Sequence, residues 1–224
     1  MGRESVNAFS GLTVGELIDL ARREIAREDD GPLSHLVALH QHPTRQVFDA
    51  AVGLLGEQDS LNRELGARIL RELGEEVNGR RPFGPEAVRV LVDRLAVEDS
   101  SRVVGWIVSA LGYNGAYEEL PAVLELADHA DSFVRFHVAA AVPSMVLGRV
   151  PGPEVLDVLG RLAADPDSDV RFYAAYALLE EIEGVSNEKK DAVAEALTGD
   201  NDEQIRNLAS SWSSREDDSA GGLP

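Results

Sequence analysis

Residues 167–178 read DSDVRFYAAYAL, and this stretch is the best copy of a motif that runs through the chain. Residues 131–142 repeat it as DSFVRFHVAAAV, and residues 202–212 repeat it as DEQIRNLASSW. The shared arginines are 36 and 35 residues apart, a period typical of helical solenoids in which each repeat is a pair of helices. Weaker copies at residues 100–112 and 59–70 keep the small and aliphatic positions but lose part of the Val-Arg pair.

A second amphipathic run precedes each copy, with aliphatic residues three and four apart. These runs are residues 47–55, 87–97, 120–127, 155–163 and 192–197. The Asp or Ser that begins each copy is a good N-cap residue. The pattern therefore predicts helix A, a short Asp-rich turn and helix B, repeated about five times. Residues 14–27 and 33–41 predict a further helix pair at the N-terminal end, and no segment alternates with period two, so we expect no sheet.

The motif Asp-x-x-Val-Arg-x-x-Ala-Ala-x-Ala-Leu resembles the HEAT repeat, in the subfamily named after bacterial phycobilin lyases. This resemblance implies an all-α fold, an α-solenoid with a right-handed superhelix of about five to six helix pairs. Tetratricopeptide arrays have a similar period, but their Trp…Leu-Gly…Tyr…Pro spacing is absent. We expect an N-terminal arm at residues 1–11, a single solenoid domain at residues 12–212, and a disordered acidic, Gly-rich tail at residues 213–224.

Small residues in helix B have a physical reason, because this helix packs against its own helix A and against neighbouring repeats. Ala174, Ala175 and Ala177 would allow close approach, while Val170 and Leu178 would supply the larger buried side chains. In HEAT families the motif arginine usually bonds an Asp of a neighbouring turn. The resemblance gives this structural ladder to Arg135, Arg171 and Arg206, with Asp131, Asp167 and Asp202 as candidate partners. Val104 replaces the arginine in the middle repeat, which interrupts the ladder there.

Pro143 lies inside the helix B that begins near Asp131, where it removes one backbone hydrogen bond. We expect a kink or an early helix end near Val142. Residues 75–84 exceed the usual inter-repeat turn and predict an exposed loop.

The composition is that of a folded protein, with 44% hydrophobic and 27% charged residues. There are 21 Lys and Arg against 40 Asp and Glu, a net charge of −19, so we expect no binding to the phosphate backbone of nucleic acids. No apolar run approaches the ~18 residues that a membrane helix needs, and the N-terminus has no signal-peptide core. We therefore expect a cytoplasmic protein with no membrane partner.

Motifs for catalysis or cofactor binding are missing from the sequence: it has no Walker loop, dinucleotide fingerprint, His-Glu-x-x-His or Gly-x-Ser-x-Gly. Zero cysteines exclude disulfides and thiolate metal sites. His40 and His42 are two residues apart at a helix end, so their side chains diverge, and we expect no metal site and no cofactor.

The candidate site follows from the helix-B register. Residues one, two and five after the motif arginine fall on the face that helix B turns to solvent. From the third copy onward these and equivalent positions hold Trp106, Ser109, Phe136, His137, Phe172, Tyr173 and Tyr176. Helix B conventionally lines the concave side of a HEAT solenoid, so the resemblance implies an aromatic groove. The competing interpretation is that these rings pack between repeats and fill space left by small alanines.

Three functions remain open on the sequence alone. The favoured one is a scaffold that binds a partner protein or peptide along the concave helix-B face, and the acidic charge favours a basic partner. The second is a small-molecule-binding protein or enzyme that uses the aromatic groove, with His137 as acid or base. The third is a purely structural subunit of a larger complex.

Overall fold

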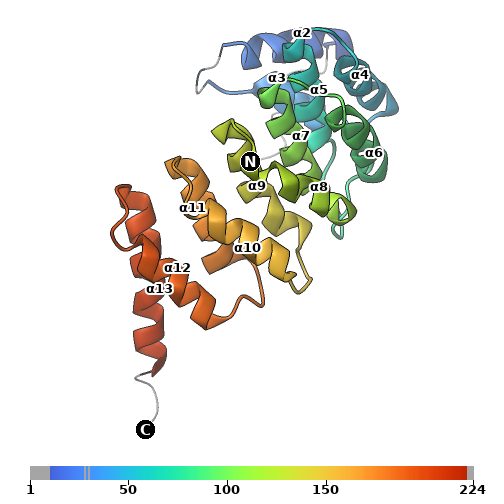
Figure 1. The fold of residues 1–224 in the computed structure, drawn as a ribbon. Coiled ribbons are helices and arrows are strands. Elements are labelled where there is room, and N and C mark those ends of the chain that lie inside the picture. Colours follow the sequence, from blue (N-terminus) through green and yellow to red (C-terminus); the bar gives the residue numbers. More distant parts are fainter. Residues whose placement is uncertain (1–10, 28, 30, 221–224) are drawn as a thin grey trace. The chain divides into compact units, whose positions relative to one another are not determined.

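The computed structural model describes residues 11–27, 29 and 31–220 (Figure 1). Within these residues the structure is helical, with twelve α-helices and no β-strand beyond one isolated bridge between Val77 and Arg80. The all-α prediction is therefore confirmed. The chain divides into two compact units, residues 1–116 (unit 1) and residues 117–224 (unit 2), which are described separately.

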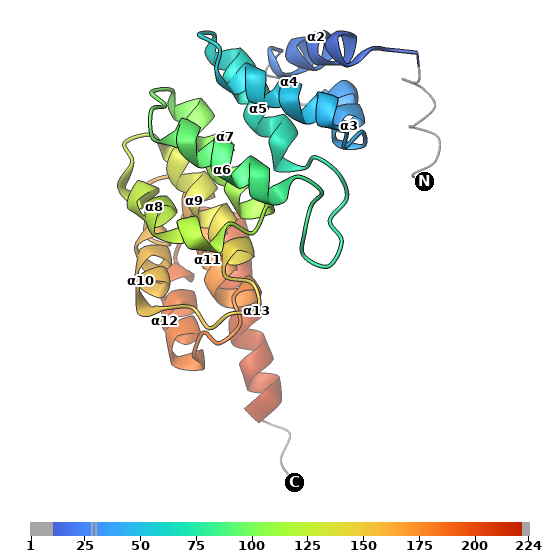
Figure 2. The ribbon, with the colours of Figure 1, turned by 90° about the vertical axis from the view of Figure 1, so that its right-hand side faces the viewer.

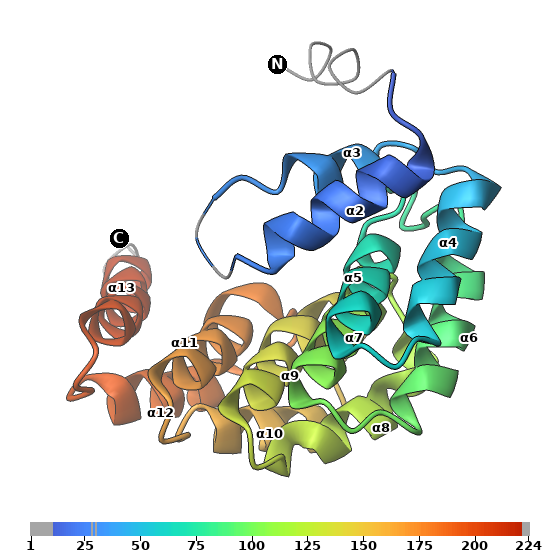
Figure 3. The ribbon, with the colours of Figure 1, turned by 90° about the horizontal axis from the view of Figure 1, so that it is seen from above.

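Unit 1 consists of three helix pairs: α2 (Val14–Ile25) with α3 (Ser34–His40), α4 (Arg45–Leu55) with α5 (Ser60–Arg71), and α6 (Gly84–Leu95) with α7 (Ser101–Tyr113). Helices α5 and α7 also pack against each other, so the helix-B elements of successive repeats are neighbours. Figure 3 shows α4 and α6 on one side of α5 and α7. This two-layer arrangement is the one that the repeat pattern predicts for helices A and B.

Unit 2 continues the alternation. Its elements are the 3₁₀ turn η1 (Tyr117–Glu119), α8 (Leu120–Glu125), the 3₁₀ turn η2 (Leu126–Asp128), α9 (Ser132–Met145), α10 (Pro153–Leu162), α11 (Ser168–Tyr176), the π-helical turn η3 (Ala177–Glu181), α12 (Asn187–Leu197) and α13 (Glu203–Ala220). Helix α11 packs against both α9 and α13. Figure 2 shows α8, α10 and α12 in one row and α9, α11 and α13 in the other.

Helix starts are set by the residues that begin each motif copy. The Asp59, Asp131 and Asp167 side chains accept hydrogen bonds from backbone N–H groups in the first turns of α5, α9 and α11. Ser100 stands at the same position before α7 but makes no such bond. The predicted N-caps are thus confirmed where the residue is Asp.

The buried stripe of helix B has the predicted register. Ala174, Ala175 and Ala177 are fully buried, and so are Val170 and Leu178. Alanine at the contact lets α11 approach both α9 and α13 closely, because no longer side chain separates the helix backbones. The small residues of the motif therefore serve packing.

Two local predictions need correction or completion. Helix α9 does not end near Val142, since it continues past Pro143 to Met145. Pro143 has no backbone N–H, so one hydrogen bond of the helix is missing. Ser144 and Met145 nevertheless stay helical, because α9 packs against neighbouring helices. The loop at residues 75–84 is a tight reversal, in which Asn78 and Gly79 both have positive φ and Val77 pairs with Arg80.

The single solenoid domain drawn from the sequence stays a prediction. The predicted single solenoid at residues 12–212 is divided between the two units. The predicted disordered tail begins at residue 213, whereas α13 extends to Ala220, and residues 221–224 lie outside the described part of the chain. Nearly all of the expected N-terminal arm, residues 1–10, also lies outside it.

Candidate functional site

Aromatic side chains gather on two neighbouring helices of unit 2. On α9, Phe133, Phe136 and His137 are three and four residues apart, so they share one face of the helix. On α11, Phe172 and Tyr173 lie one turn before Tyr176. Because α9 and α11 pack side by side, the two sets meet.

Ring contacts join these residues into one continuous row. The Phe136 ring meets the edge of Tyr173 with centroids 4.8 Å apart, which connects α9 to α11. Along α11, Phe172 contacts Tyr173 at 5.5 Å and stacks on Tyr176 at 6.0 Å with only 9° between the ring planes. These distances are typical of favourable edge-to-face and stacked pairs. We define the aromatic strip as Phe133, Phe136, Phe172, Tyr173 and Tyr176, in which the His137 ring connects Phe133 to Phe136.

The strip is partly open to solvent. Tyr173 and Tyr176 each expose 38% of their surface, while Phe133, Phe136 and Phe172 are half-buried. Phe172 also packs against the apolar core that α11, α12 and α13 share. Both interpretations of the sequence stay predictions: the phenylalanines are the more buried part of the strip and the tyrosines are the more exposed part.

His137 lies beneath the strip rather than on it. Its side chain is 5% exposed, and its ring meets Phe133 at 4.5 Å and Phe136 at 4.9 Å, both edge to face. An acid–base group has to reach the proton that it transfers. The described geometry therefore places the imidazole in a packing position, covered by two phenylalanine rings.

A cavity of about 270 Å³ opens beside the strip, at the beginnings of α9 and α11. Its lining combines two aromatic rings with two carboxylates: Ser132, Phe133, Phe136, Asp167 and Asp169. Asp167, one of the lining residues, accepts hydrogen bonds at Oδ1 from the backbone N–H groups of Asp169 and Val170, so its carboxylate caps α11. The sequence register did not include Phe133, although its spacing of three and four residues from Phe136 and His137 is the available signal.

Trp106 and Ser109 lie on α7 of unit 1 and are described separately from the strip. Ser109 is buried, which corrects the prediction that it faces solvent. Trp106 is half-buried, and the Arg68 guanidinium lies 3.8 Å from its ring centroid. The reason for both differences is the close packing of α5 against α7, which brings Arg68 over the indole.

The Arg68 side chain is itself buried and paired. Its guanidinium forms an ion pair with Glu64 at 2.5 Å, and Glu64 accepts a hydrogen bond from Arg102 at 2.8 Å. Burial lowers the pKa of Arg68, which the negative charge of Glu64 counteracts. Unit 1 therefore carries a guanidinium that is stacked on an aromatic ring and paired with a carboxylate.

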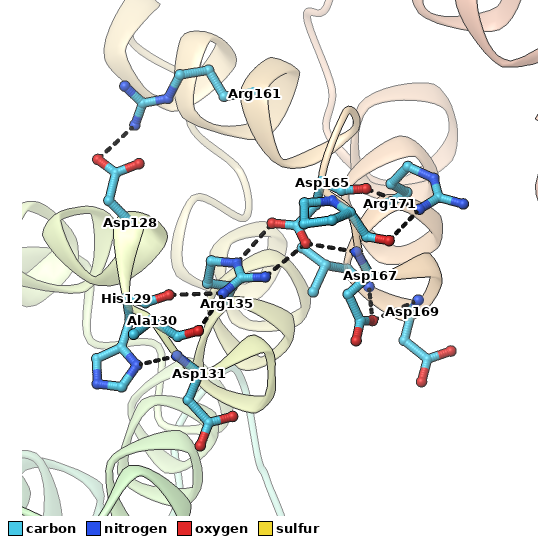
Figure 4. A network of polar contacts seen from close by, with 12 residues as sticks. Asp128, His129, Ala130, Asp131, Arg135, Arg161, Asp165, Asp167, Asp169 and Arg171 are labelled. Carbon is cyan, nitrogen blue, oxygen red and sulfur yellow. Dashed lines mark hydrogen bonds and ion pairs between the residues drawn. The ribbon is translucent and has the colours of Figure 1, made fainter.

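The motif arginines form a repeated structure that we call the arginine clamp. In Arg135, Nη1 donates to the backbone carbonyls of His129 and Ala130, while Nε and Nη2 donate to the two carboxylate oxygens of Asp165 at 2.7 and 2.8 Å (Figure 4). Arg171 repeats this arrangement with Asp200, at 2.8 Å for both carboxylate bonds. Each clamp thus links the turn before one helix B to the turn before the next.

The clamp partners are not the ones expected. Asp131, Asp167 and Asp202 do not pair with the motif arginines as predicted, because their carboxylates cap α9, α11 and α13. The partners Asp165 and Asp200 stand two residues before the caps, and Arg206 donates to the backbone carbonyl of Asp200. The signal was present in the sequence, since Asp165-Pro-Asp167 and Asp200-Asn-Asp202 repeat the same spacing.

Unit 1 contains a clamp that the motif did not identify. Arg63 donates to both oxygens of Glu98, at 2.9 and 2.8 Å, and to the backbone carbonyls of Glu57 and Gln58. Burial alone would raise the pKa of Glu98, but hydrogen bonds from Arg63 and Arg94 outweigh it and lower the pKa to about 2. The same opposition of burial and arginine bonding lowers the pKa of Asp165.

The His40–His42 pair is used in hydrogen bonds to the backbone. His40 Nε2 contacts the Arg68 carbonyl at 2.9 Å, and His42 Nδ1 contacts the Ala38 carbonyl at 2.7 Å. Burial lowers the pKa of His40. Across the described ranges, no group of three or more His, Asp or Glu is placed to hold a metal ion. None of the helices in those ranges combines the length and the apolar character that crossing a membrane requires.

Comparison with known proteins gives structural likenesses but no family assignment. No protein-family model matches the sequence, and neither does any curated protein. Among solved structures, YibA of Escherichia coli matches with a TM-score of 0.65 and 20% identity over 91% of this chain and 71% of that one. An engineered protein matches with a TM-score of 0.52 and 21% identity over 92% of each chain. At these identities the likeness concerns the fold alone, and this chain shares its all-helical repeat architecture with solved proteins.

Proposed function

We propose that this chain is a helical repeat scaffold that binds a partner protein or peptide on the helix-B face of unit 2, across the aromatic strip. The observation that carries the proposal is the continuous row of rings in which Tyr173 and Tyr176 each expose 38% of their surface. Exposed tyrosines held by neighbouring rings contribute contact area at low cost in conformational entropy, and they are common binding hot spots.

Charge supports a basic partner. Unit 2 has 8 Lys and Arg against 22 Asp and Glu, a net charge of −14, out of −19 for the whole chain. A surface of this sign attracts positively charged partners over distances up to about 8 Å at physiological salt and repels nucleic-acid phosphates. The proposal therefore includes a basic protein or peptide as partner and excludes nucleic acid. A cytoplasmic location is a separate part of the proposal.

The alternative of a small-molecule site with His137 as acid or base remains a prediction from the sequence. The 5% exposure of His137 does not favour it, because two phenylalanine rings cover the imidazole. A purely structural subunit is the other alternative, and it predicts that the exposed tyrosines make no measurable contribution to binding.

The test is a selection of 12-residue peptides from a random library on the full chain, followed by titration of the enriched peptides. We expect Tyr173→Ala and Tyr176→Ala to weaken binding at least about fivefold each. Tyr117→Ala is the matched control, because Tyr117 lies in the same unit with the same 38% exposure but outside the strip. Enriched peptides that are equally sensitive to all three changes, or to none, would contradict the proposal.

A further inference from the structure

The cavity at the beginnings of α9 and α11 has the lining of a site for a planar cation. Phe133 and Phe136 contribute aromatic rings, and Asp167 and Asp169 contribute carboxylates. A guanidinium group binds favourably to both kinds of surface, by stacking on a ring and by donating hydrogen bonds to carboxylate oxygens. A volume of about 270 Å³ accommodates the end of one long side chain but not a folded element.

The protein already makes this combination inside unit 1. There, the Arg68 guanidinium lies 3.8 Å from the Trp106 ring centroid and forms an ion pair with Glu64 at 2.5 Å. The cavity of unit 2 presents rings and carboxylates in a similar combination, but an arginine is not part of its lining. An external guanidinium would therefore complete in unit 2 the kind of arrangement that Arg68 completes in unit 1.

Two arginines on the same helices, Arg135 and Arg171, are already paired with carboxylates. Arg135 is bonded to Asp165 and Arg171 is bonded to Asp200, each through two hydrogen bonds to the carboxylate. The charges of Asp167 and Asp169 are thus additional to the clamps. Because Asp167 caps the first turn of α11, its carboxylate rather than an external anion occupies the N–H groups at this helix end. Both observations favour a cation over an anion as ligand.

We propose that unit 2 binds an arginine side chain of its partner in this cavity, with the guanidinium against Phe133 and Phe136 and paired with Asp167 and Asp169. The inference rests on the proposed function, since it names one contact that a basic partner makes on the helix-B face. It also identifies what the partner must contain: an arginine next to a segment that covers Tyr173 and Tyr176.

The test uses a small probe, so that it does not depend on the partner. The ¹⁵N-labelled full chain is titrated at constant ionic strength with Nα-acetyl-arginine amide, and separately with the citrulline analogue, which has nearly the same shape but no charge. We expect a dissociation constant in the millimolar range for the arginine probe, with amide shifts at residues 132–136 and 167–170. The citrulline probe should bind at least about fivefold more weakly.

A double variant supplies the specificity control. Asp167→Asn with Asp169→Asn removes two charges from the cavity and keeps a capping residue at position 167. Asp202→Asn with Glu203→Gln makes the equivalent change at the first turn of α13, away from the cavity. We expect the first pair to weaken the arginine probe at least about fivefold and the second pair to change it less than about twofold. Equal losses in both pairs, equal binding of citrulline, or shifts outside the cavity would each overturn the proposal.

The outcome separates this inference from the proposed function. Selected peptides that depend on Tyr173 and Tyr176 but tolerate replacement of every arginine would leave the scaffold function in place and remove the arginine site. Conversely, an arginine probe that binds in the cavity while no peptide depends on the two tyrosines would retain the site and remove the strip as the binding surface.

Discussion

The aromatic side chains on α7 of unit 1 and those on α9 and α11 of unit 2 have different kinds of neighbour. On α7, guanidinium groups cover two rings, with Arg68 3.8 Å from the Trp106 centroid and Arg71 3.6 Å from the Tyr113 centroid. In unit 2, the rings of the aromatic strip pack on one another and leave Tyr173 and Tyr176 partly exposed. The net charge also differs between the units: it is −5 for unit 1 and −14 for unit 2.

This difference lies on a shared frame. Both units use a clamp of the same geometry, Arg63 with Glu98 in unit 1 and Arg135 with Asp165 in unit 2. The clamp and the alanine-rich stripe satisfy the requirements of packing, so the remaining positions of helix B are not constrained by the repeat. The comparison teaches that differences in function between repeats should be sought at those positions.

The largest effect should come from breaking the clamp of unit 1. Glu98→Gln leaves Arg63 and Arg94 without their carboxylate, and removing one partner of a buried ion pair costs about 3–5 kcal/mol of unfolding free energy. Asp99→Asn is the control, because Asp99 lies 3.3 Å from the same arginine but is 91% exposed, and we expect less than about 0.5 kcal/mol. Urea unfolding measures both, and similar losses would show that burial of the clamp does not matter.

The second effect concerns pH. Glu98 has a pKa of about 2 in the folded chain, against about 4.3 when unfolded, so its contribution to stability is complete above about pH 5 and is lost as the pH falls toward 2. We expect the difference in unfolding free energy between the native chain and Glu98→Gln to shrink by about 2–3 kcal/mol between pH 6 and pH 2. The pKa values of Asp165 and Asp200 are also lowered, so we expect unit 2 to lose stability as the pH falls for the same reason. A pH-independent difference would contradict this account.

The third prediction compares the rings themselves. Trp106→Ala removes the surface on which Arg68 stacks, and we expect a loss of about 2–3 kcal/mol in unfolding free energy. Tyr173→Ala removes a side chain that is 38% exposed, so about 1 kcal/mol or less is expected. Thermal unfolding of the two variants decides the matter, and a Tyr173 loss as large as that of Trp106 would mean that the strip is packing rather than surface.

The smallest effect should follow from net charge. Raising the NaCl concentration from 0.05 to 0.5 M screens repulsion among the carboxylates of unit 2, and we expect stabilisation by roughly 0.5 kcal/mol there and less in unit 1. Amide hydrogen exchange in α11 and α5 reports the two units separately. Equal stabilisation of the two helices would show that the charge difference has no energetic consequence.

Much of the fold could be predicted from the sequence, because period, caps and alanine positions are local signals. Helix α11, its cap Asp167 and the buried face with Ala174 and Ala175 all follow from the motif at residues 167–178. The clamp partners were missed because the choice between Asp165 and Asp167 depends on which carboxylate the first helical turn already uses. Which carboxylate caps the helix and which binds the arginine depends on the folded geometry. The two-residue spacing between the two aspartates is the only sequence signal of this division.

The candidate site was predicted less completely, because contacts between helices decide exposure. Position alone predicted that Tyr173 and Tyr176 reach solvent, and each exposes 38% of its surface. It could not show that Phe133 and Phe136 close over His137, or that Arg68 from another helix covers Trp106. Side chains that arrive from a neighbouring element leave no trace in the periodicity of the element that they cover.

The spacing of the clamp has a consequence for how such a chain can change length. Every carboxylate partner in the clamps stands two residues before the N-cap of the next helix B, and its oxygen also accepts from the N–H of that cap residue, as Asp165 does from Asp167 and Asp200 does from Asp202. Two consecutive repeats therefore contain both partners of one clamp, the arginine from the first and the carboxylate from the second. Duplicating or deleting one whole repeat of 35 or 36 residues rejoins an arginine to an equivalent acid, whereas a partial insertion leaves a buried guanidinium without its counter-charge. The clamp thus favours changes in length by whole repeats. We expect such an array to grow by tandem duplication of repeats rather than by insertion of single residues.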